Sequence, residues 1–245
     1  MSAPVTLPIR APGEPDRGRT ARGAARGVGE LFITLGVLLL LLCIYQLWWT
    51  NVESARATVV ERDQILSQWQ DPTVAPPASA AIPVVQPVDG QGFALLYIPR
   101  LRDKVWGLPV IEGVGLDVLA KGAGHYPRTA VPGQVGNFAI AAHRATHNEP
   151  FRDIDQLQVG DKVYVRTQSA WYTYVLDRDK IVQPTDTWVV GPVPGKPGVA
   201  PTEKLITLTT CNPRWASYQR WIWWGHQRGE RAVAQGPPPA IAGKV

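Results

Sequence analysis

The feature that most constrains this chain is an apolar run over residues 31–49, which includes five consecutive leucines. At about 1.5 Å of rise per residue, a helix of roughly 20 residues crosses a hydrocarbon layer about 30 Å thick. Tyr45, Trp48 and Trp49 gather at the far end of the run, as in an interfacial aromatic belt. No cleavage pattern of the Ala-x-Ala type follows, so the sequence predicts an uncleaved transmembrane anchor over residues 30–50.

The segments on either side of this run predict its orientation. Residues 1–29 contain five arginines, two carboxylates and no apolar periodicity, so we expect a disordered arm. Carboxylates at Glu53, Glu61 and Asp63 dilute the positive charge after the run. The arginine-rich arm should therefore stay in the cytoplasm and the rest of the chain outside the cell membrane. Because the arm holds most of the formal charge of +5, that charge argues little for a nucleic-acid partner.

Composition divides the remaining chain into three parts. Residues 51–90 start with a weak helical pattern and continue as an Ala-rich stretch with five prolines, which predicts a juxtamembrane helix and a semi-rigid spacer. A folded domain is expected over residues 91–232, and a flexible tail over residues 233–245.

The expected domain is mainly β. Short apolar runs predict strands at residues 93–99, 105–111, 137–142, 161–165, 171–175, 180–182, 207–211 and 220–224. Only residues 116–121 and 150–157 allow short helices. The strand predicted at 137–142 is continuously apolar from residue 138 on, so we expect it to be buried on both faces. Strands so outnumber helices that we expect a closed β-barrel.

Cys211 is the best candidate for a reactive group. It follows the alternating residues 207–210 and precedes Asn212 and Pro213, so it should lie where a buried strand meets a turn. Arg220 opens the next strand-like run, so the two side chains should lie on neighbouring strands. A thiol and a guanidinium facing one groove indicate acyl-transfer chemistry. The alternative is a buried, inert cysteine; a disulfide with Cys43 is excluded if Cys43 lies in the bilayer.

A cysteine nucleophile needs a base, and His143 is the best placed of the four histidines. It follows the run at 137–142, so it should also lie at a strand end. His125 and His226 lie in turn-rich or exposed contexts and are expected to be structural. His143 and His147 are four residues apart, which suits metal binding on a helix, but the surrounding residues indicate a loop. We therefore predict neither a metal nor a cofactor.

Two motifs resemble one family. Thr-Leu-x-Thr-Cys at 207–211 with Arg220 nine residues later resembles the active-site signature of sortases, the membrane-anchored cysteine transpeptidases of Gram-positive surfaces. The segment that starts with Gly-His-Tyr-Pro at 124–127 and ends in Ala-Ala-His-Arg at 141–144 is also similar to the sortase segment that carries the catalytic histidine. The match covers residues 91–232 and implies an eight-stranded sortase barrel.

The resemblance also implies roles. Cys211 would form a thioester with a sorting-signal peptide of the Leu-Pro-x-Thr-Gly or Leu-Ala-x-Thr-Gly type. His143 would protonate the leaving amine and deprotonate the incoming one, and Arg220 would stabilise the oxyanion or hold the peptide. The acceptor would be an amine of a peptidoglycan precursor or a pilin. The Cys-Asn-Pro continuation and the spacing to Arg220 look most like class E sortases.

Two further residues are candidates for substrate binding. Thr210 precedes the cysteine and offers a hydroxyl or its backbone; the alternative is an ordinary strand threonine. By alternation Arg220, Ile222 and Trp224 share one face of their strand, so Trp224 is predicted to line the groove. The other reading for the tryptophans between residues 215 and 224 is core or barrel wall.

Other classes of protein agree less well with these motifs. A papain-like hydrolase needs a Cys-Gly-x-Cys-Trp signature, and an L,D-transpeptidase needs Ser-His-Gly-Cys; the sequence contains neither. A membrane-tethered β-domain that binds peptides or glycans without catalysis stays open. Alkylation of Cys211 discriminates, since a binding module keeps its affinity and a transpeptidase loses turnover.

Overall fold

The computed structural model describes residues 17–70 and 84–245, and the chain separates into two compact units, Met1–Gln46 and Leu47–Val245. The first unit contains helix α1 (Arg17–Ile44). Its residues Ala25–Ile44 have a mean hydropathy of 2.4 and are long and apolar enough to cross a membrane. The prediction of a disordered arm up to residue 29 is wrong for residues 17–29, because alanine and arginine are strong helix formers and extend α1 toward the N-terminus. The first part of that arm, residues 1–16, lies outside the described residues.

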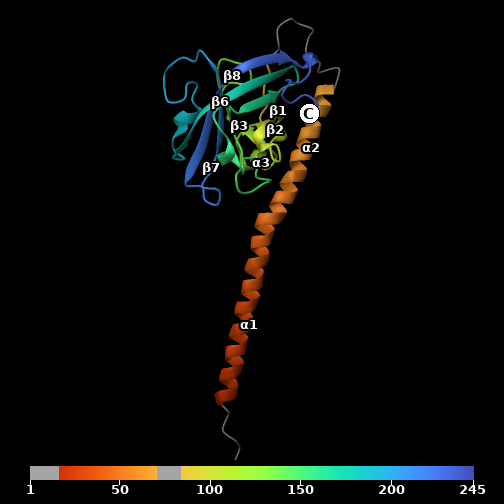
Figure 1. The fold of residues 1–245 in the computed structure, drawn as a ribbon. Helices are drawn as coiled ribbons and strands as arrows, with labels where there is room; N and C mark the ends of the chain where they lie inside the picture. The colour runs from red at the N-terminus through yellow and green to blue at the C-terminus, as the bar shows by residue number, and fades with distance from the viewer. Residues whose placement is uncertain (1–16, 71–83) are drawn as a thin grey trace, which may run out of the picture. The chain divides into compact units, whose positions relative to one another are not determined.

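The second unit is built mainly from strands (Figure 1). The strands are β1 (Gly92–Tyr97), β2 (Trp106–Glu112), β3 (Ala123–His125), β4 (Gly136–Ala141), β5 (Lys162–Arg166), β6 (Ala170–Val182), β7 (Lys204–Asn212) and β8 (Gln219–Ala232). The α-helices are α2 (Thr50–Gln70) and α3 (Leu116–Leu119). A π-helical turn, η1 (Tyr45–Trp49), lies at the junction of the two units, and 3₁₀ turns form η3 (Pro99–Leu101), η4 (Ile154–Gln156), η5 (Thr187–Val190) and η6 (Val233–Gln235).

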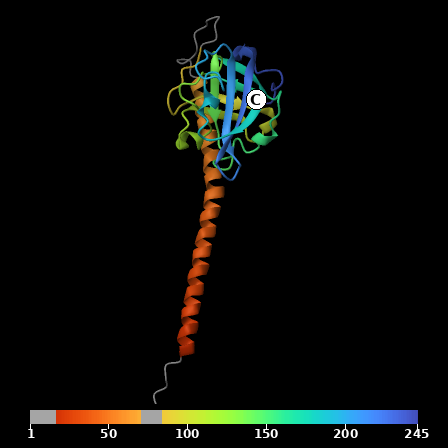
Figure 2. The same cartoon turned by 90° about the vertical axis from the view of Figure 1, so that its left-hand side faces the viewer.

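The strands close into a barrel in the order β1-β2-β3-β4-β7-β8-β6-β5, which confirms the expected fold. Two neighbouring pairs, β2–β3 and β4–β7, are parallel, and the others are antiparallel. The strands predicted at 171–175 and 180–182 are one strand, β6, because β8 pairs with it throughout and a register shift near Leu176 absorbs the polar residues between them. Figure 2 shows the long strands of the second half of the chain running side by side.

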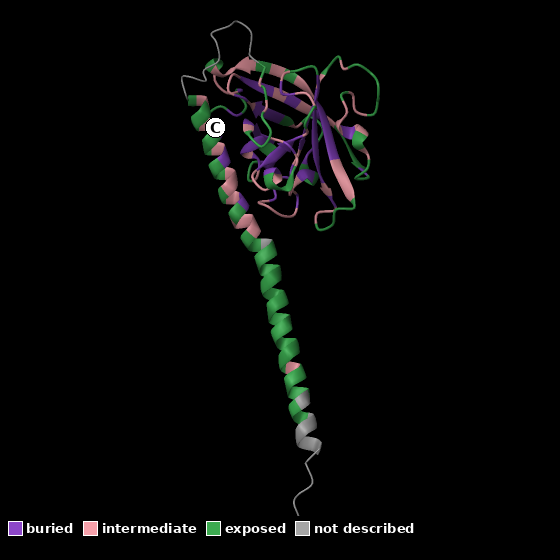
Figure 3. Ribbon diagram, turned by 180° about the vertical axis from the view of Figure 1, so that it is seen from behind, coloured by how far each residue is buried: buried purple, intermediate pink, exposed green. Residues whose placement is uncertain are grey.

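The core fills the barrel and takes alternate side chains from each strand. Figure 3 shows buried residues, in purple, along the strands of the barrel. β4 contributes Phe138 and Ile140, β7 contributes Ile206 and Leu208, and β8 contributes Trp223. All of β4 except its last residue is buried, as expected for a strand covered on both faces. The segment at 150–157 forms only the short turn η4 rather than a regular helix.

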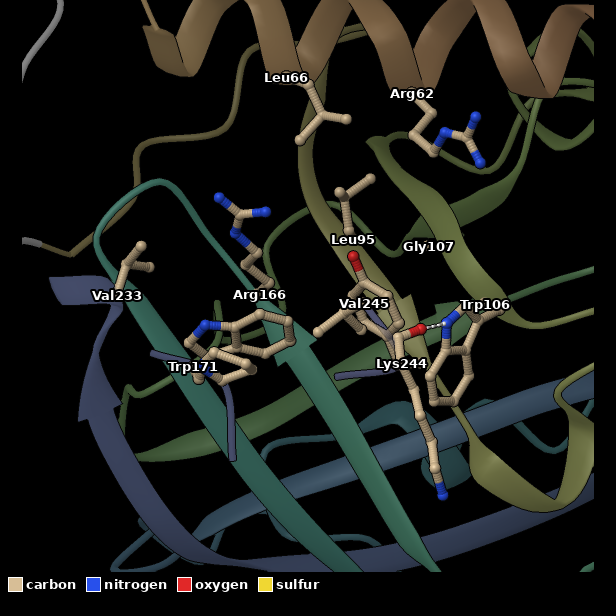
Figure 4. Close-up of a pocket in the computed structure, with 12 residues that line it drawn as sticks. Arg62, Leu66, Leu95, Trp106, Gly107, Arg166, Trp171, Val233, Lys244 and Val245 are labelled. Atoms are coloured by element: carbon tan, nitrogen blue, oxygen red, sulfur yellow. Dashed lines mark hydrogen bonds between the residues drawn. The ribbon is translucent and has the colours of Figure 1, made fainter. Parts of the chain in front are cut away.

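Helix α2 packs against β1 and β2, so the folded unit starts well before the predicted boundary at residue 91. Ile65 of α2 is only 1% exposed and lies so close to Gly92 that a Cβ there would come within 2.4 Å of it. Figure 4 shows Leu66 and Arg62 of α2 above a cavity of about 430 Å³. The helix expected after the membrane anchor is thus part of the barrel unit; the spacer at 71–83 lies outside the described residues.

The prediction of a flexible tail over residues 233–245 is also wrong. Ile241 is 1% exposed and packs in a cluster with Ile65, Leu95 and Trp171. The Lys244 carbonyl accepts a hydrogen bond of 2.6 Å from the Trp106 indole (Figure 4). The Arg231 guanidinium also donates to the Gln235 and Pro237 carbonyls. Burial of Ile241 and these hydrogen bonds together offset the chain entropy that is lost when the segment is ordered.

Candidate active site

Three neighbouring strands bring the predicted residues together. In the antiparallel pair β7–β8, Cys211 lies directly opposite Arg220, as expected from the spacing of the two motifs. In the parallel pair β4–β7, Ala141 lies opposite Thr209, and the Ala142 N–H donates to the Thr209 carbonyl at 3.2 Å. β4 ends at Ala141, and His143 follows two residues later, just as Cys211 follows Thr209 by two residues on β7.

The three side chains also share one face. Ile206 and Leu208 of β7 and Trp223 of β8 point into the core, so alternation places Cys211 and Arg220 on the outer face of the sheet. The core residues of β4 place His143 on the outer face in the same way. His143, Cys211 and Arg220 thus form one row across the end of three strands, which we call the outer row.

His143 is partly buried. Its ring stacks on His147 with 4.6 Å between ring centroids and 23° between ring planes. Burial, with a smaller contribution from the His147 charge, lowers the pKa of His143 to about 4. Its Nε2 atom is buried and has no hydrogen-bond partner among the residues that the structure describes. The imidazole is therefore neutral near pH 7 and has a nitrogen available for proton transfer.

Cys211 and Arg220 are partly accessible. Cys211 is an unpaired thiol of intermediate exposure, whereas the inert alternative requires a buried one. The Arg220 guanidinium donates to the Ser217 and Gln219 carbonyls, both at 2.8 Å. These contacts leave other N–H groups of the fork for an anionic ligand, because a guanidinium carries five donors.

Arg144 was part of the sequence motif, but its role as a clamp was not predicted. Its guanidinium is buried and donates to the Asn212 side-chain oxygen at 2.7 Å and to Asp155 at 3.2 Å. It also lies 5.1 Å from the ring centroid of Trp221. We call the contacts of Arg144 with Asn212 and Asp155 the Arg144 clamp. Because Arg144 follows His143 and Asn212 follows Cys211, this clamp sets the distance between the two candidate catalytic strand ends. A charged residue directly after an apolar strand is the only sequence signal for it.

Thr210 makes a second link between the same strands. Its side chain is buried, and Oγ1 donates to the Ala142 carbonyl at 2.7 Å. The hydroxyl therefore points away from the outer row and is already paired. Thr210 can therefore contact a substrate through its backbone, but not through its hydroxyl.

Trp224 shares the outer face, as alternation predicted, but the structure does not bring it to Cys211. It lies opposite Thr207 and is buried in a cluster with Val182, Val189 and Ile222. Its indole donates to the Val189 carbonyl at 3.1 Å. The connection between β6 and β7, which includes η5, covers this part of the face and separates Trp224 from the outer row.

Tyr126, by contrast, lies near the outer row and was not predicted. Its hydroxyl is 3.1 Å from the Thr209 hydroxyl, one position below Cys211 on the outer face. The Tyr126 N–H donates to the Ala139 carbonyl of β4 at 2.9 Å. Tyr126 belongs to the Gly-His-Tyr-Pro motif, so the sequence contained a signal for this residue, but no role was predicted for it.

The remaining histidines have structural positions. His125 is buried and its Nδ1 lies 2.5 Å from the Glu112 carboxylate. His226 pairs with Asp177 at 2.7 Å, far along β8 from Arg220. Within residues 17–70 and 84–245, no three His, Cys, Asp or Glu side chains gather as metal ligands would.

A closed barrel that presents a thiol, a neutral imidazole and a guanidinium in one row has the groups of a cysteine-nucleophile acyl-transfer site. The model of the sortase domain matches residues 96–228. The chain belongs to the sortase family, a family of cysteine transpeptidases.

Named relatives agree with this assignment. The chain is 40% identical to sortase SrtE1 of Streptomyces coelicolor over 89% of its own length and 61% of that protein's length. A structure of sortase E from Streptomyces avermitilis matches 63% of this chain and 99% of that one, with 44% identity and a TM-score of 0.57. A crystal structure of sortase E1 from Streptomyces coelicolor with a tripeptide in the active site matches 64% and 100%, with 38% identity and a TM-score of 0.58.

Proposed function

We propose that this chain is a membrane-anchored transpeptidase that cleaves a Leu-Pro-x-Thr-Gly or Leu-Ala-x-Thr-Gly sorting signal between Thr and Gly. The acyl group then passes to an amine of a peptidoglycan precursor or a pilin. The observation that carries the proposal is the outer row, in which Arg220 lies opposite Cys211 on β8 and His143 follows the end of the other neighbouring strand, β4. Membership of the sortase family supports it.

In the first half-reaction, the Cys211 sulfur attacks the threonine carbonyl carbon while neutral His143 accepts the thiol proton. The carbonyl oxygen becomes an oxyanion, and the free donors of Arg220 stabilise it. The C–N bond to glycine then breaks, and His143 gives its proton to the leaving amine. The products are a thioester on Cys211 and a peptide with a new amino terminus.

In the second half-reaction, an incoming amine attacks the thioester carbon. His143 takes a proton from this amine and returns one to the Cys211 sulfur as the C–S bond breaks. The net result is exchange of one amide for another. Because burial lowers the pKa of His143 to about 4, the imidazole is unprotonated near pH 7 and is available to accept a proton.

The substrate peptide is proposed to lie along the outer face beside Cys211. The tripeptide in the active site of the Streptomyces coelicolor enzyme supports a peptide ligand here. Thr210 would contribute through its backbone, while Trp224 would act indirectly by supporting the β6–β7 connection. The similarity to sortases SrtE1 and SrtE2 of that organism supports a class E assignment.

The proposed location is the cell membrane, with one span, the N-terminus in the cytoplasm and the barrel outside. The apolar helix over Ala25–Ile44 and the arginines before it support this orientation. Protease added to cells stripped of their wall should digest the barrel and spare the arm; digestion of the arm alone would reverse the topology.

The test of the activity is incubation of the full chain in lipid nanodiscs with a panel of pentapeptide signals and candidate amines. Mass spectrometry should detect both the thioester on Cys211 and the ligated product. If peptides bind with the same affinity before and after alkylation of Cys211 and no cleavage occurs, the chain is a binding module instead.

A further inference from the structure

The loop that follows His143 has an unusual backbone. His147, Asn148 and Glu149 have φ values of 53°, 63° and 51°, three consecutive non-glycine residues in the left-handed region. Non-glycine residues are disfavoured in this region, because the Cβ atom lies too close to the following carbonyl oxygen. A backbone of this kind persists only where the surroundings hold it, and it is often found at functional sites.

Three elements hold this loop from outside. The Asn51 side chain, in the first turn of α2, accepts a hydrogen bond of 2.9 Å from the Asn148 N–H. Lys104 donates to the Asn148 carbonyl at 3.1 Å. Arg214, in the β7–β8 connection, pairs with the buried Glu149 carboxylate at 2.8 Å. Of these three contacts, the one made by Asn51 is the one that comes from outside the β-barrel, because Asn51 belongs to α2.

This loop geometry places the His147 ring on the ring of His143, the candidate base. With its backbone in the left-handed region, His147 lies on His143, and its Nδ1 is 3.0 Å from the Thr146 hydroxyl. The stack keeps water from one face of His143. It also limits rotation of that ring, whose orientation relative to Cys211 decides whether proton transfer is possible.

The other side of His147 faces α2 and α3. A cavity of about 270 Å³ lies there, lined by His147 together with Glu53 and Ser54 of α2 and Asp117 near the start of α3. Lys121 also lines it. The charged groups near His147 are therefore Glu53, Asp117 and Lys121 on this side and the titratable His143 on the other.

We infer that α2 is a positioning element for the candidate base: Asn51 holds the 146–149 turn, and this turn holds His147 against His143. The inference rests on the proposed function for its catalytic consequence. Asn51 and His147 touch no reacting atom, and they act through the orientation and solvent exclusion of His143.

The test compares four variants of the full chain in lipid nanodiscs. Asn51→Ala removes the acceptor, and Asn51→Asp keeps one. His147→Ala removes the stacked ring, and His147→Phe keeps a flat ring without a charge. Gln68→Ala, at an exposed position of α2, is the matched control for changes to the helix itself.

Two measurements are made on each variant. Transpeptidation should show kcat reduced about tenfold in Asn51→Ala and His147→Ala, with KM unchanged, because a group that orients a reacting side chain is lost. Asn51→Asp and His147→Phe should recover most of the rate. NMR titration of labelled histidine should show the midpoint of His143 moving up from about 4 toward 6.5 in both alanine variants.

The NMR titration separates the positioning inference from the proposed function, because it requires no substrate. If no peptide is cleaved by the wild type but the His143 midpoint moves as expected, the positioning inference stands and the proposed function fails. If the wild type is active while Asn51→Ala and His147→Ala keep both the rate and the His143 midpoint, the inference is overturned. Equal loss in Gln68→Ala would also overturn it, because the effect would then belong to the helix as a whole.

Discussion

Cys211 and Arg220 are directly opposed residues of the antiparallel β7–β8 pair, and both project from its outer face. Opposed residues on one face have Cβ atoms about 4.5–5.5 Å apart, so thiol and guanidinium can reach the same ligand atom. The next predictions test the consequences of this arrangement and of the contacts around it.

Replacement of the nucleophile should separate activity from folding. Cys211→Ala is expected to abolish acyl transfer, because no other thiol lies in the barrel unit. Stability should change little, since the side chain is partly exposed at a strand end and its loss opens no buried cavity. Mass spectrometry of the peptide products and thermal unfolding provide the two readouts. Cleavage by the variant would assign the nucleophile to another residue.

The Arg220→Lys variant tests the guanidinium fork. Lysine keeps the charge but loses the planar pair of donors, so the rate should fall roughly 10²–10³-fold, equivalent to about 2.7–4 kcal/mol of transition-state stabilisation. The measurement is the transpeptidation rate at saturating amine, with circular dichroism as the control for folding. A folded variant that keeps more than about half the activity would remove Arg220 from the site.

Acid should destabilise the protein through His143. Its pKa is about 4 in the folded chain and near 6.5 when unfolded, so the unfolded state binds the extra proton first. The contribution of neutral His143 to stability is thus complete above pH 6.5 and is lost as pH falls toward 4. Thermal unfolding of wild type and His143→Gln between pH 4 and 8 measures this: the variant should lose less stability across that window. Parallel curves for the two proteins would contradict the assigned environment.

The Arg144 clamp should matter for both stability and rate. Arg144→Lys cannot donate to Asn212 and Asp155 together, so we expect a loss of about 1–3 kcal/mol of unfolding free energy. Because the strand ends that carry His143 and Cys211 then separate more easily, kcat should fall more than KM rises. Arg152→Lys, at a half-buried position in the same loop, is the control. Unchanged kcat in a destabilised Arg144 variant would restrict the clamp to a structural role.

Because the C-terminal segment is ordered, replacement of a buried residue in it should lower the free energy of unfolding, whereas a substitution in a flexible tail should not. Ile241→Ala should cost about 2–5 kcal/mol, since the side chain is fully buried between α2 and the barrel. Val245→Ala, at an exposed position, should be nearly neutral. Chemical denaturation measures both. Equal midpoints for the two variants would show that the segment is not held by Ile241.

The sequence predicted the parts of the fold that depend on local pattern. Strand alternation and the spacing of Cys211 and Arg220 were sufficient to anticipate that the two residues lie on neighbouring strands; their direct opposition on β7 and β8 comes from the structure. Alternation also gave the correct face for Trp224. It could not show that the β6–β7 connection covers this face, because a period of two identifies which side chains share a side and not what packs on it.

The parts that were missed depend on contacts between distant segments. Nothing in the pattern of residues 51–70 indicates that Ile65 docks on Gly92, or that Asn51 reaches Asn148. Ile241 gave no periodic signal because it is a single apolar residue among prolines and glycine. β3 was missed because it has only three residues, one of them the turn-typical Gly124, and its partners are brought to it by the rest of the barrel.

The parallel pairing of β4 with β7 has a consequence for biogenesis. His143 leaves the ribosome well before Cys211 and its neighbour Arg220. Parallel strands distant in sequence pair only after a large loop has closed, which is a slow and non-local step. A chain in which β7 and β8 have not yet paired lacks this arrangement, so the proposed acyl-transfer site forms only when these two strands complete the barrel.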